Sequence, residues 1–227
     1  AAQAVIYLID KPGTPQSVIR AGVIAPPRSE GDEIAREALD AAFGGSFTSR
    51  FNMKLREEKG WAYGAYSSIQ GGRGSRLFVA SASVQADKTA ESMAETAALL
   101  KGITADRRID ARELASAKDN MALGLSSDWS TSNGIARYLA DQVSSRLPDD
   151  YYLEYPSAVT AETLDAVNAA GGAILANRPV TWVVVGDRAK IEDKIDTLEN
   201  LLPRLDCLMV GGGMANTFLA AQGCDLK

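Results

Sequence analysis

An arginine and a tyrosine, Arg56 and Tyr63, lie seven positions apart in the most informative stretch of this sequence. A guanidinium offers planar bidentate donors and a phenol a directional hydroxyl, so the pair can bind a peptide carbonyl or a carboxylate. The spacing also fits ordinary structure, because the helix dipole favours an arginine in a last helical turn and strand tyrosines usually pack half-buried. Both interpretations depend on the elements that carry the two residues.

A short amphipathic helix is predicted after the Gly-Gly pair at 44–45. Ser46 is the candidate N-cap, because its hydroxyl can accept a hydrogen bond from an amide of the first turn. Phe47, Phe51 and Leu55 then recur every fourth residue, which places them on one helix face. This pattern predicts a buried apolar face on the helix that carries the arginine.

The helix is predicted to end just before Gly60, which can adopt the left-handed conformation that closes many helices. The aromatic-rich stretch that follows predicts a strand, in which Trp61, Tyr63 and Ala65 would share one face. Arg56 would then lie in the last helical turn and Tyr63 early in the strand. The tight turn between them would let the two side chains approach one point.

This stretch resembles the signature of the pitrilysin or insulinase family of zinc metallopeptidases, in the domain that does not carry zinc. The resemblance implies that Arg56 and Tyr63 bind the substrate backbone near the scissile bond. Phe51 departs from the usual leucine, and Glu58-Lys59 stands where lysine and a variable residue are usual. The signature includes Gly44 and matches at Gly45, Ser46, Ser49, Arg50, Leu55, Arg56, Glu57, Gly60, Ala62 and Tyr63.

The metal half of such an enzyme carries an HxxEH helix and a downstream glutamate, and neither exists here because the sequence has no histidine. The two cysteines, Cys207 and Cys224, make a poor zinc site without histidine and fit no disulfide framework. The resemblance therefore implies no catalytic residue, metal or other cofactor in this chain. It implies zinc on a partner domain or subunit that carries HxxEH.

The order of predicted elements favours an α+β fold. Hairpins and segregated helices predict a two-layer sandwich, with a mainly antiparallel sheet and helices packed on one face. The resemblance implies the same architecture, a metallopeptidase domain of the LuxS and pitrilysin kind, over residues 1–190. The predicted strands are 4–10, 17–25, 61–66, 77–84 and 181–185, and the predicted helices are 31–43, 47–59, one capped by Asp87, 110–125, 130–145, 149–156 and 160–176.

Residues 191–227 differ in character and, with Lys190, resemble an interior segment of phosphoglycerate kinase. In that kinase the positions of Lys190 and Gly211, Gly212 and Gly213 lie around the bound nucleotide. The pattern predicts a short helix, a strand at 208–210, a glycine turn and a second helix. Because most of a kinase is missing, the tail is interpreted as a fusion, a recombinant join or an assembly artefact, and is expected to pack weakly.

Composition limits the classes of partner. The net charge of −5 argues against nucleic acid, since phosphate binding needs a basic face. No apolar run reaches membrane-spanning length. We expect a soluble protein of the bacterial periplasm or cytoplasm, forming a homodimer or heterodimer, with a leader or preceding domain removed before Ala1. Substrate and compartment stay open.

Three functions remain from the sequence. The first is the substrate-binding, metal-free half of a pitrilysin-type zinc metalloendopeptidase, inactive alone, which positions a peptide for a zinc-bearing partner. The second is a structural or assembly subunit of the same family. The third is a nucleotide-binding or phosphoglycerate-kinase-related protein, through the tail.

Overall fold

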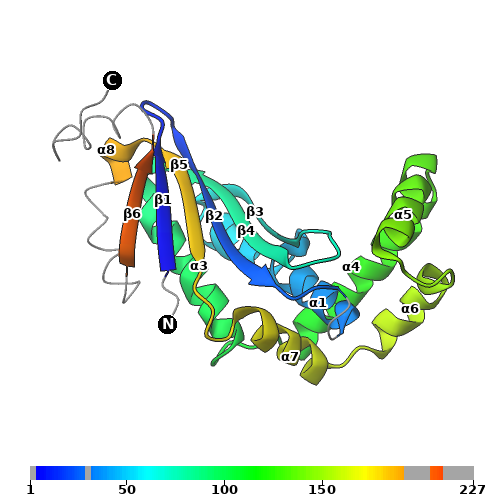
Figure 1. Ribbon diagram of the computed structural model, residues 1–227. Helices are drawn as coiled ribbons and strands as arrows, with labels where there is room; N and C mark the ends of the chain where they lie inside the picture. The colour runs from blue at the N-terminus through cyan, green and yellow to red at the C-terminus, as the bar shows by residue number, and fades with distance from the viewer. Residues whose placement is uncertain (1–3, 29–31, 192–204, 212–227) are drawn as a thin grey trace.

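A six-stranded mixed sheet forms the centre of the molecule (Figure 1). The computed structural model describes residues 4–28, 32–191 and 205–211, the last of these only as backbone. The strand order in the sheet is β3-β4-β2-β5-β1-β6. The strands are β1 (Ala4–Asp10), β2 (Gln16–Ala25), β3 (Ala62–Ile69), β4 (Arg76–Gln85), β5 (Thr181–Gly186) and β6 (Leu205–Gly211).

The sheet is antiparallel across β3, β4, β2 and β5, and parallel across β5, β1 and β6. The predicted hairpin of β3 and β4 is confirmed. β5 lies between β1 and β2, with Trp182 opposite Ile6 on one side and Ala21 on the other. The two strands that flank the Pro-Gly turn are therefore joined through a strand from the far end of the chain.

The strand predicted in the kinase-like tail joins this sheet as β6. It runs parallel to β1, with Tyr7 opposite Met209 and Ile9 opposite Gly211. The backbone of this strand therefore continues the peptidase-like sheet at its edge, while the expectation that the tail packs weakly stays a prediction. The predicted glycine turn beyond Gly211 and the helix after it lie outside the described residues, as does the whole segment 192–204 between α8 (Arg188–Ile191) and β6.

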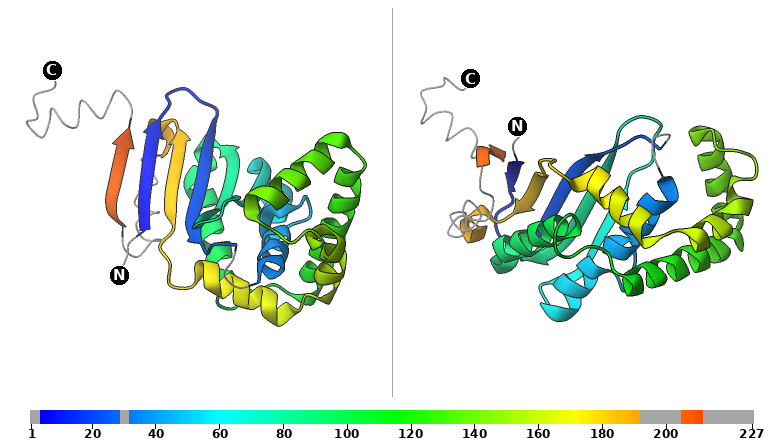
Figure 2. Two further views of the ribbon diagram at one scale, coloured as in Figure 1. Left: turned by 45° about the vertical axis from the view of Figure 1, so that its right-hand side comes forward. Right: turned by 90° about the horizontal axis from the view of Figure 1, so that it is seen from below.

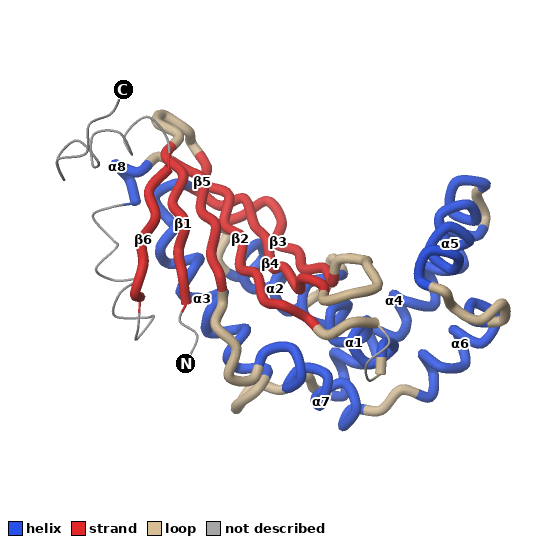
Figure 3. The backbone as a smooth tube through the Cα atoms, in the orientation of Figure 1, coloured by secondary structure: helices blue, strands red, loops and turns tan. Residues whose placement is uncertain are grey.

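Helices gather on one side of the sheet, and an arm of three helices extends from it (Figures 1, 2 and 3). α1, α3 and α7 contact one another or the strands, and α4, α5 and α6 form the arm, in which α4 and α6 contact α1. The helices are α1 (Glu33–Asp40), η1 (Ala41–Gly45), α2 (Arg50–Asn52), η2 (Met53–Glu58), η3 (Ala86–Lys88), α3 (Thr89–Ile103), α4 (Ala111–Trp129), α5 (Ser132–Ser145), α6 (Tyr151–Ala161) and α7 (Leu164–Leu175).

The core lies between the sheet and these helices. Alternate residues of β2, among them Ile19, Ala21 and Val23, are buried there, while Ile24 on the opposite face is 57% exposed. This alternation is the pattern of a sheet covered on one face only. Together with the helix arrangement it confirms the predicted two-layer α+β fold.

Several predicted helix ends differ in the structure. α7 is capped by Thr163, whose hydroxyl accepts from the amide of Ala166, because α6 continues through Pro156 to Ala161 and displaces the predicted start at 160. The N-cap of α3 is Lys88 and not Asp87, because a 3₁₀ turn precedes the helix. Caps depend on where the preceding segment ends, which propensity alone does not fix.

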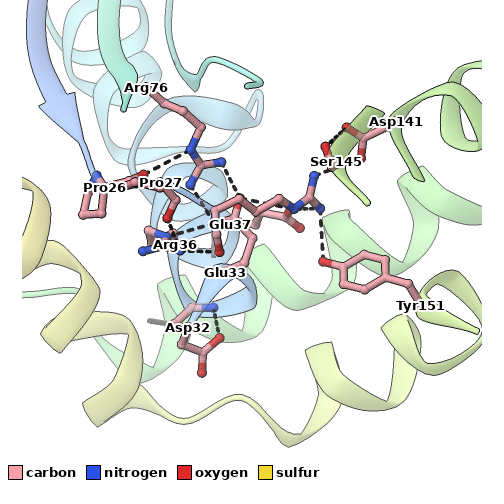
Figure 4. Close-up of polar contacts among 12 residues, drawn as sticks. Pro26, Pro27, Asp32, Glu33, Arg36, Glu37, Arg76, Asp141, Ser145 and Tyr151 are labelled. Atoms are coloured by element: carbon pink, nitrogen blue, oxygen red, sulfur yellow. Dashed lines mark hydrogen bonds and ion pairs between the residues drawn. The ribbon is translucent and has the colours of Figure 1, made fainter. Parts of the chain in front are cut away.

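A buried polar network joins the sheet to the helices (Figure 4). Glu33 accepts hydrogen bonds from Arg76 at 2.6 and 2.7 Å and from Arg36 at 2.9 Å. Arg28 extends the network to the arm, pairing with Asp141 at 2.9 Å and with Glu37 at 3.4 Å. The network fixes α1, which leads directly into the signature segment.

Within the described ranges, no helix is long and apolar enough to cross a membrane.

Candidate functional site

The signature segment begins as the continuation of α1. A π-helical turn, η1, extends α1 to Gly45, and Ser46 ends it in an extended conformation. The next helix begins only at Arg50, with Ser49 at its N-cap. The prediction that Ser46 caps a helix starting at Phe47 is therefore wrong, since the preceding helix runs up to Ser46.

The small residues of the signature allow close packing of this turn on β3. A Cβ on Gly44 would lie 2.5 Å from Ser67 Oγ and 2.6 Å from Ser67 N, and one on Gly45 would lie 3.1 Å from Asp40 O. Ser67 donates to Asp40 at 2.5 Å, and burial raises the pKa of Asp40 to about 6 although this hydrogen bond lowers it. Ser49 is buried as well. These positions shape the scaffold of the site.

Arg50 anchors the signature helix to α4. Its guanidinium donates to both carboxylate oxygens of Glu113, at 2.7 and 2.5 Å, and to the backbone carbonyls of Arg107 and Arg108. Glu113 also completes the capping box of α4 with Asp110. Arg50 therefore has a structural role, because its guanidinium donates to acceptors within the protein.

The helix is short and widens into the π-helical turn η2, which carries Arg56 in its last turn as predicted. Phe51 and Leu55 are fully buried, and the ring of Phe51 stacks on Phe43 at 5.5 Å. Gly60 has a φ of 65°, the predicted left-handed closure. The apolar face therefore fixes the direction in which Arg56 projects.

Tyr63 lies on the exposed side of β3. Its side chain is 82% exposed while that of Ala65 is fully buried, so the two do not share a face as predicted. The pairing of β3 with β4 shifts register between Ala62 and Ala65, which is a β-bulge or irregularity. Such a shift inserts a residue and reverses the alternation of faces, which sequence periodicity cannot show.

The structure brings Arg56 and Tyr63 together at the turn. The guanidinium carbon of Arg56 lies 5.5 Å from the ring centroid of Tyr63 and 4.4 Å from that of Phe47. Its Nε pairs with Glu57 at 3.3 Å, and the Arg56 side chain remains 28% exposed. Within the part of the chain that the structure describes, Arg56 has no other ion pair. Its remaining donors are therefore available to a ligand at the surface.

The sequence missed two residues of this site. Phe47 was assigned to the apolar helix face, yet it lies before the helix and its side chain is 56% exposed. Asn52 is fully buried, donates to the carbonyl of Phe47 at 2.7 Å and accepts from the amide of Ala65 at 3.0 Å. A polar residue inside a short apolar helix was the available signal, since buried amides need partners.

Neighbouring carboxylates are held in ion pairs. Glu58 accepts from Lys54 at 2.6 Å, and this hydrogen bond lowers the pKa of Glu58. Lys59 pairs with Glu95 of α3 at 3.3 Å and lies 5.2 Å from the ring centroid of Trp61. Charge around the site is therefore largely balanced.

The predicted nucleotide-contacting residues lie elsewhere. Lys190 in α8 is half-exposed and pairs with Asp187 at 3.8 Å, and Gly211 ends β6. Gly212 and Gly213 lie outside the described residues. Across the described ranges, no group of three His, Cys, Asp or Glu residues could hold a metal ion.

The chain belongs to a peptidase family. The family model described as "Peptidase M16 inactive domain" matches residues 2–121, more than half of the 227 residues. This match includes the whole Arg56–Tyr63 turn. It confirms the resemblance to pitrilysin-type peptidases and identifies the chain as the non-catalytic type of domain.

Solved structures share the fold. A peptidase M16 inactive domain from Pseudomonas fluorescens gives a TM-score of 0.72 at 21% identity, covering 82% of this chain and 44% of that chain. A protease from Helicobacter pylori gives a TM-score of 0.71 at 19% identity, covering 81% of this chain and 44% of that chain. A chain of complex III2 from Candida albicans gives a TM-score of 0.65 at 14% identity, covering 88% of this chain and 49% of that chain. This chain thus spans less than half of each of these proteins.

The C-terminal segment resembles phosphoglycerate kinase. The phosphoglycerate kinase family model matches residues 159–227. The enzyme from Sinorhizobium medicae is 59% identical over 49 residues, 22% of this chain and 12% of the kinase's length. The matched region includes β5, which the structure places in the middle of the peptidase-like sheet. The division of the chain at residue 190 stays a prediction.

Proposed function

We propose that this chain is the substrate-binding, metal-free half of an M16-type zinc metalloendopeptidase. Arg56 and Tyr63 hold the backbone of a peptide while a partner domain or subunit with HxxEH cleaves it. The observation that carries the proposal is the pairing of these two side chains at the end of η2, where Tyr63 is 82% exposed and the Arg56 side chain 28% exposed. Membership of the family makes a peptide the natural ligand.

The two side chains differ in what they supply. The Arg56 guanidinium can donate in bidentate geometry to a carbonyl or carboxylate, and the Tyr63 hydroxyl can donate or accept at a second point. Two fixed points orient an extended backbone, and a bound geometry close to that of reaction removes part of the barrier. Because the contacts are made to the backbone, side-chain specificity is expected to be loose.

Zinc belongs to the partner in this proposal. The sequence contains no histidine, and the residues that the structure describes offer no three-ligand cluster. Zinc on the partner would polarise the scissile carbonyl and lower the pKa of a bound water. This chain contributes only binding and orientation.

Reconstitution tests the proposal. The purified chain is mixed with candidate HxxEH-bearing partners, and cleavage of an unfolded peptide is followed with and without a zinc chelator. We expect chelator-sensitive cleavage that needs both chains. Full cleavage by the partner alone, unaffected by adding this chain, would count against it.

A second candidate is an assembly subunit without a proteolytic role. The fold also occurs in a chain of complex III2 from Candida albicans. This alternative predicts a stable complex with a partner that is insensitive to loss of Arg56 and Tyr63. The exposed pairing of the two residues favours the peptidase role.

A third candidate is nucleotide binding through the tail, which the kinase match from 159 to 227 favours. Only about one eighth of the Sinorhizobium medicae kinase is present, so most of a kinase's two domains is missing. Titration with ADP separates this alternative, because saturable binding would support it.

A further inference from the structure

Phe47 contacts Arg56 more closely than Tyr63 does. Its ring centroid lies 4.4 Å from the guanidinium carbon, against 5.5 Å for Tyr63. A cation over an aromatic face is attracted by the ring quadrupole, which restricts where the guanidinium can point. Because 56% of Phe47 is still exposed, part of its surface is also open to a ligand that reaches Arg56.

Asn52 links the segments that carry both rings. Its amide nitrogen donates to the carbonyl of Phe47 at 2.7 Å, and its oxygen accepts from the amide of Ala65 at 3.0 Å. The first bond fixes the loop before the helix, and the second fixes β3 at the register shift just after Tyr63. The side chain is fully buried, so water does not compete for these bonds.

We propose that Phe47 is a third substrate-facing residue of the Arg56–Tyr63 site, and that Asn52 is the positioning residue that sets both rings against the guanidinium. Phe47 contacts an apolar side chain of the peptide beside the backbone held by Arg56. The ligand in this inference rests on the proposed function, whereas the arrangement of rings around Arg56 belongs to this chain alone. The two parts are therefore tested separately.

The arrangement is tested by the NMR signal of the Arg56 Cδ methylene protons in the full chain, because the Nε–H group is also paired with Glu57. A proton over an aromatic face is shielded, so we expect an upfield signal, assigned by its loss in Arg56→Ala. Phe47→Ala and Asn52→Ala should move the signal towards that of exposed arginines, and Phe47→Tyr should leave it in place. Asn168→Ala is the matched control, because Asn168 also bridges backbone groups, at Ile109, far along the chain.

The ligand is tested by the fluorescence anisotropy of a short unstructured peptide with a central leucine. Phe47→Ala should weaken binding of this probe about threefold to tenfold. The same substitution should weaken binding by a smaller factor for a second probe, which carries aspartate in place of leucine. Asn52→Ala should weaken both probes and Asn168→Ala neither.

The possible outcomes are distinct. Unchanged Arg56 signals in Phe47→Ala and Asn52→Ala would overturn the arrangement. Equal loss for the leucine and aspartate probes would overturn the apolar contact. If the wild-type chain binds no probe while the signals shift as expected, the proposed function fails and the positioning role stands. If Asn52→Ala does not fold, Asn52→Leu replaces it, because leucine fills the same buried volume and removes both polar contacts, to Phe47 and to Ala65.

Discussion

The guanidinium carbon of Arg56 lies 5.5 Å from the ring centroid of Tyr63, although the two residues belong to a π-helical turn and a strand. The left-handed Gly60 reverses the chain between them. The register shift in β3 turns Tyr63 outward, to the same surface as Arg56. The site therefore depends on two local irregularities of the backbone.

Replacing Tyr63 separates its hydroxyl from its ring. Tyr63→Phe keeps the ring beside Arg56 and removes one neutral hydrogen bond, so peptide binding should weaken about twofold to tenfold. Tyr63→Ala removes both and should weaken binding further. Because the side chain is 82% exposed, the melting temperatures of both variants should stay close to wild type. Equal binding by all three proteins would contradict a role for Tyr63.

Arg50→Ala should lower the free energy of unfolding, because Arg50 holds the signature helix and does not contact the ligand. The substitution leaves the carboxylate of Glu113 and two backbone carbonyls without their charged donor, at a cost of about 2–3 kcal/mol. Denaturant unfolding measures the loss. Arg137→Ala is the control, because the ion pair of Arg137 with Asp128 is exposed and worth less than about 1 kcal/mol. Similar losses in the two variants would refute an anchoring role for Arg50.

Gly44→Ala tests the close approach of η1 to β3. The new methyl group would lie 2.6 Å from the backbone nitrogen of Ser67, which cannot move aside, so we expect a loss of about 1–3 kcal/mol. Gly124→Ala in α4 has nothing within 4 Å and should instead stabilise the chain by about 0.5–1 kcal/mol. Opposite signs in thermal unfolding are the predicted result, and a neutral Gly44→Ala would contradict the packing.

Glu37 should make stability depend on pH. Burial raises its pKa from 4.5 to about 7, although Tyr155 donates to it at 2.6 Å and lowers the value. Between these two values the folded state binds more protons than the unfolded state, so the contribution of Glu37 to stability falls as pH rises. Relative to Glu37→Gln, the wild-type chain should lose stability between about pH 4.5 and pH 7.

Melting temperatures of the two proteins across this range measure the effect. Tyr155→Phe removes the donor and should extend the loss to higher pH, because the pKa of Glu37 then rises further. Parallel melting curves for wild type and Glu37→Gln would show that the carboxyl does not titrate in this window.

Much of the fold could be predicted from sequence because it rests on regular patterns. The alternation in β2 and β4 and the apolar spacing of Phe51 and Leu55 report burial directly. Gly60 predicted the turn at the end of the helix, because few other residues tolerate its left-handed backbone conformation. These signals are local, so no knowledge of the partner elements was needed.

The missed features depend on neighbours distant in sequence. The place of β5 between β1 and β2, and the entry of β6 at the edge, are set by pairing between distant segments. Phe47 was wrongly predicted to lie in the signature helix. The π-helical turn after α1 runs to Gly45, so the next helix begins only at Arg50. The exposure of Tyr63 follows from a register shift against β4, which no periodicity in β3 encodes.

The most direct test is kcat/KM for peptide cleavage by the reconstituted complex with Arg56→Ala. A lost charge-assisted contact of about 1.5–3 kcal/mol should lower kcat/KM by roughly one to two orders of magnitude. Arg137→Ala, which removes an exposed arginine whose ion pair with Asp128 lies on the helical arm, serves as the matched control and should change kcat/KM little. An unchanged kcat/KM for Arg56→Ala in a normally assembled complex would contradict the claim that this chain holds the substrate.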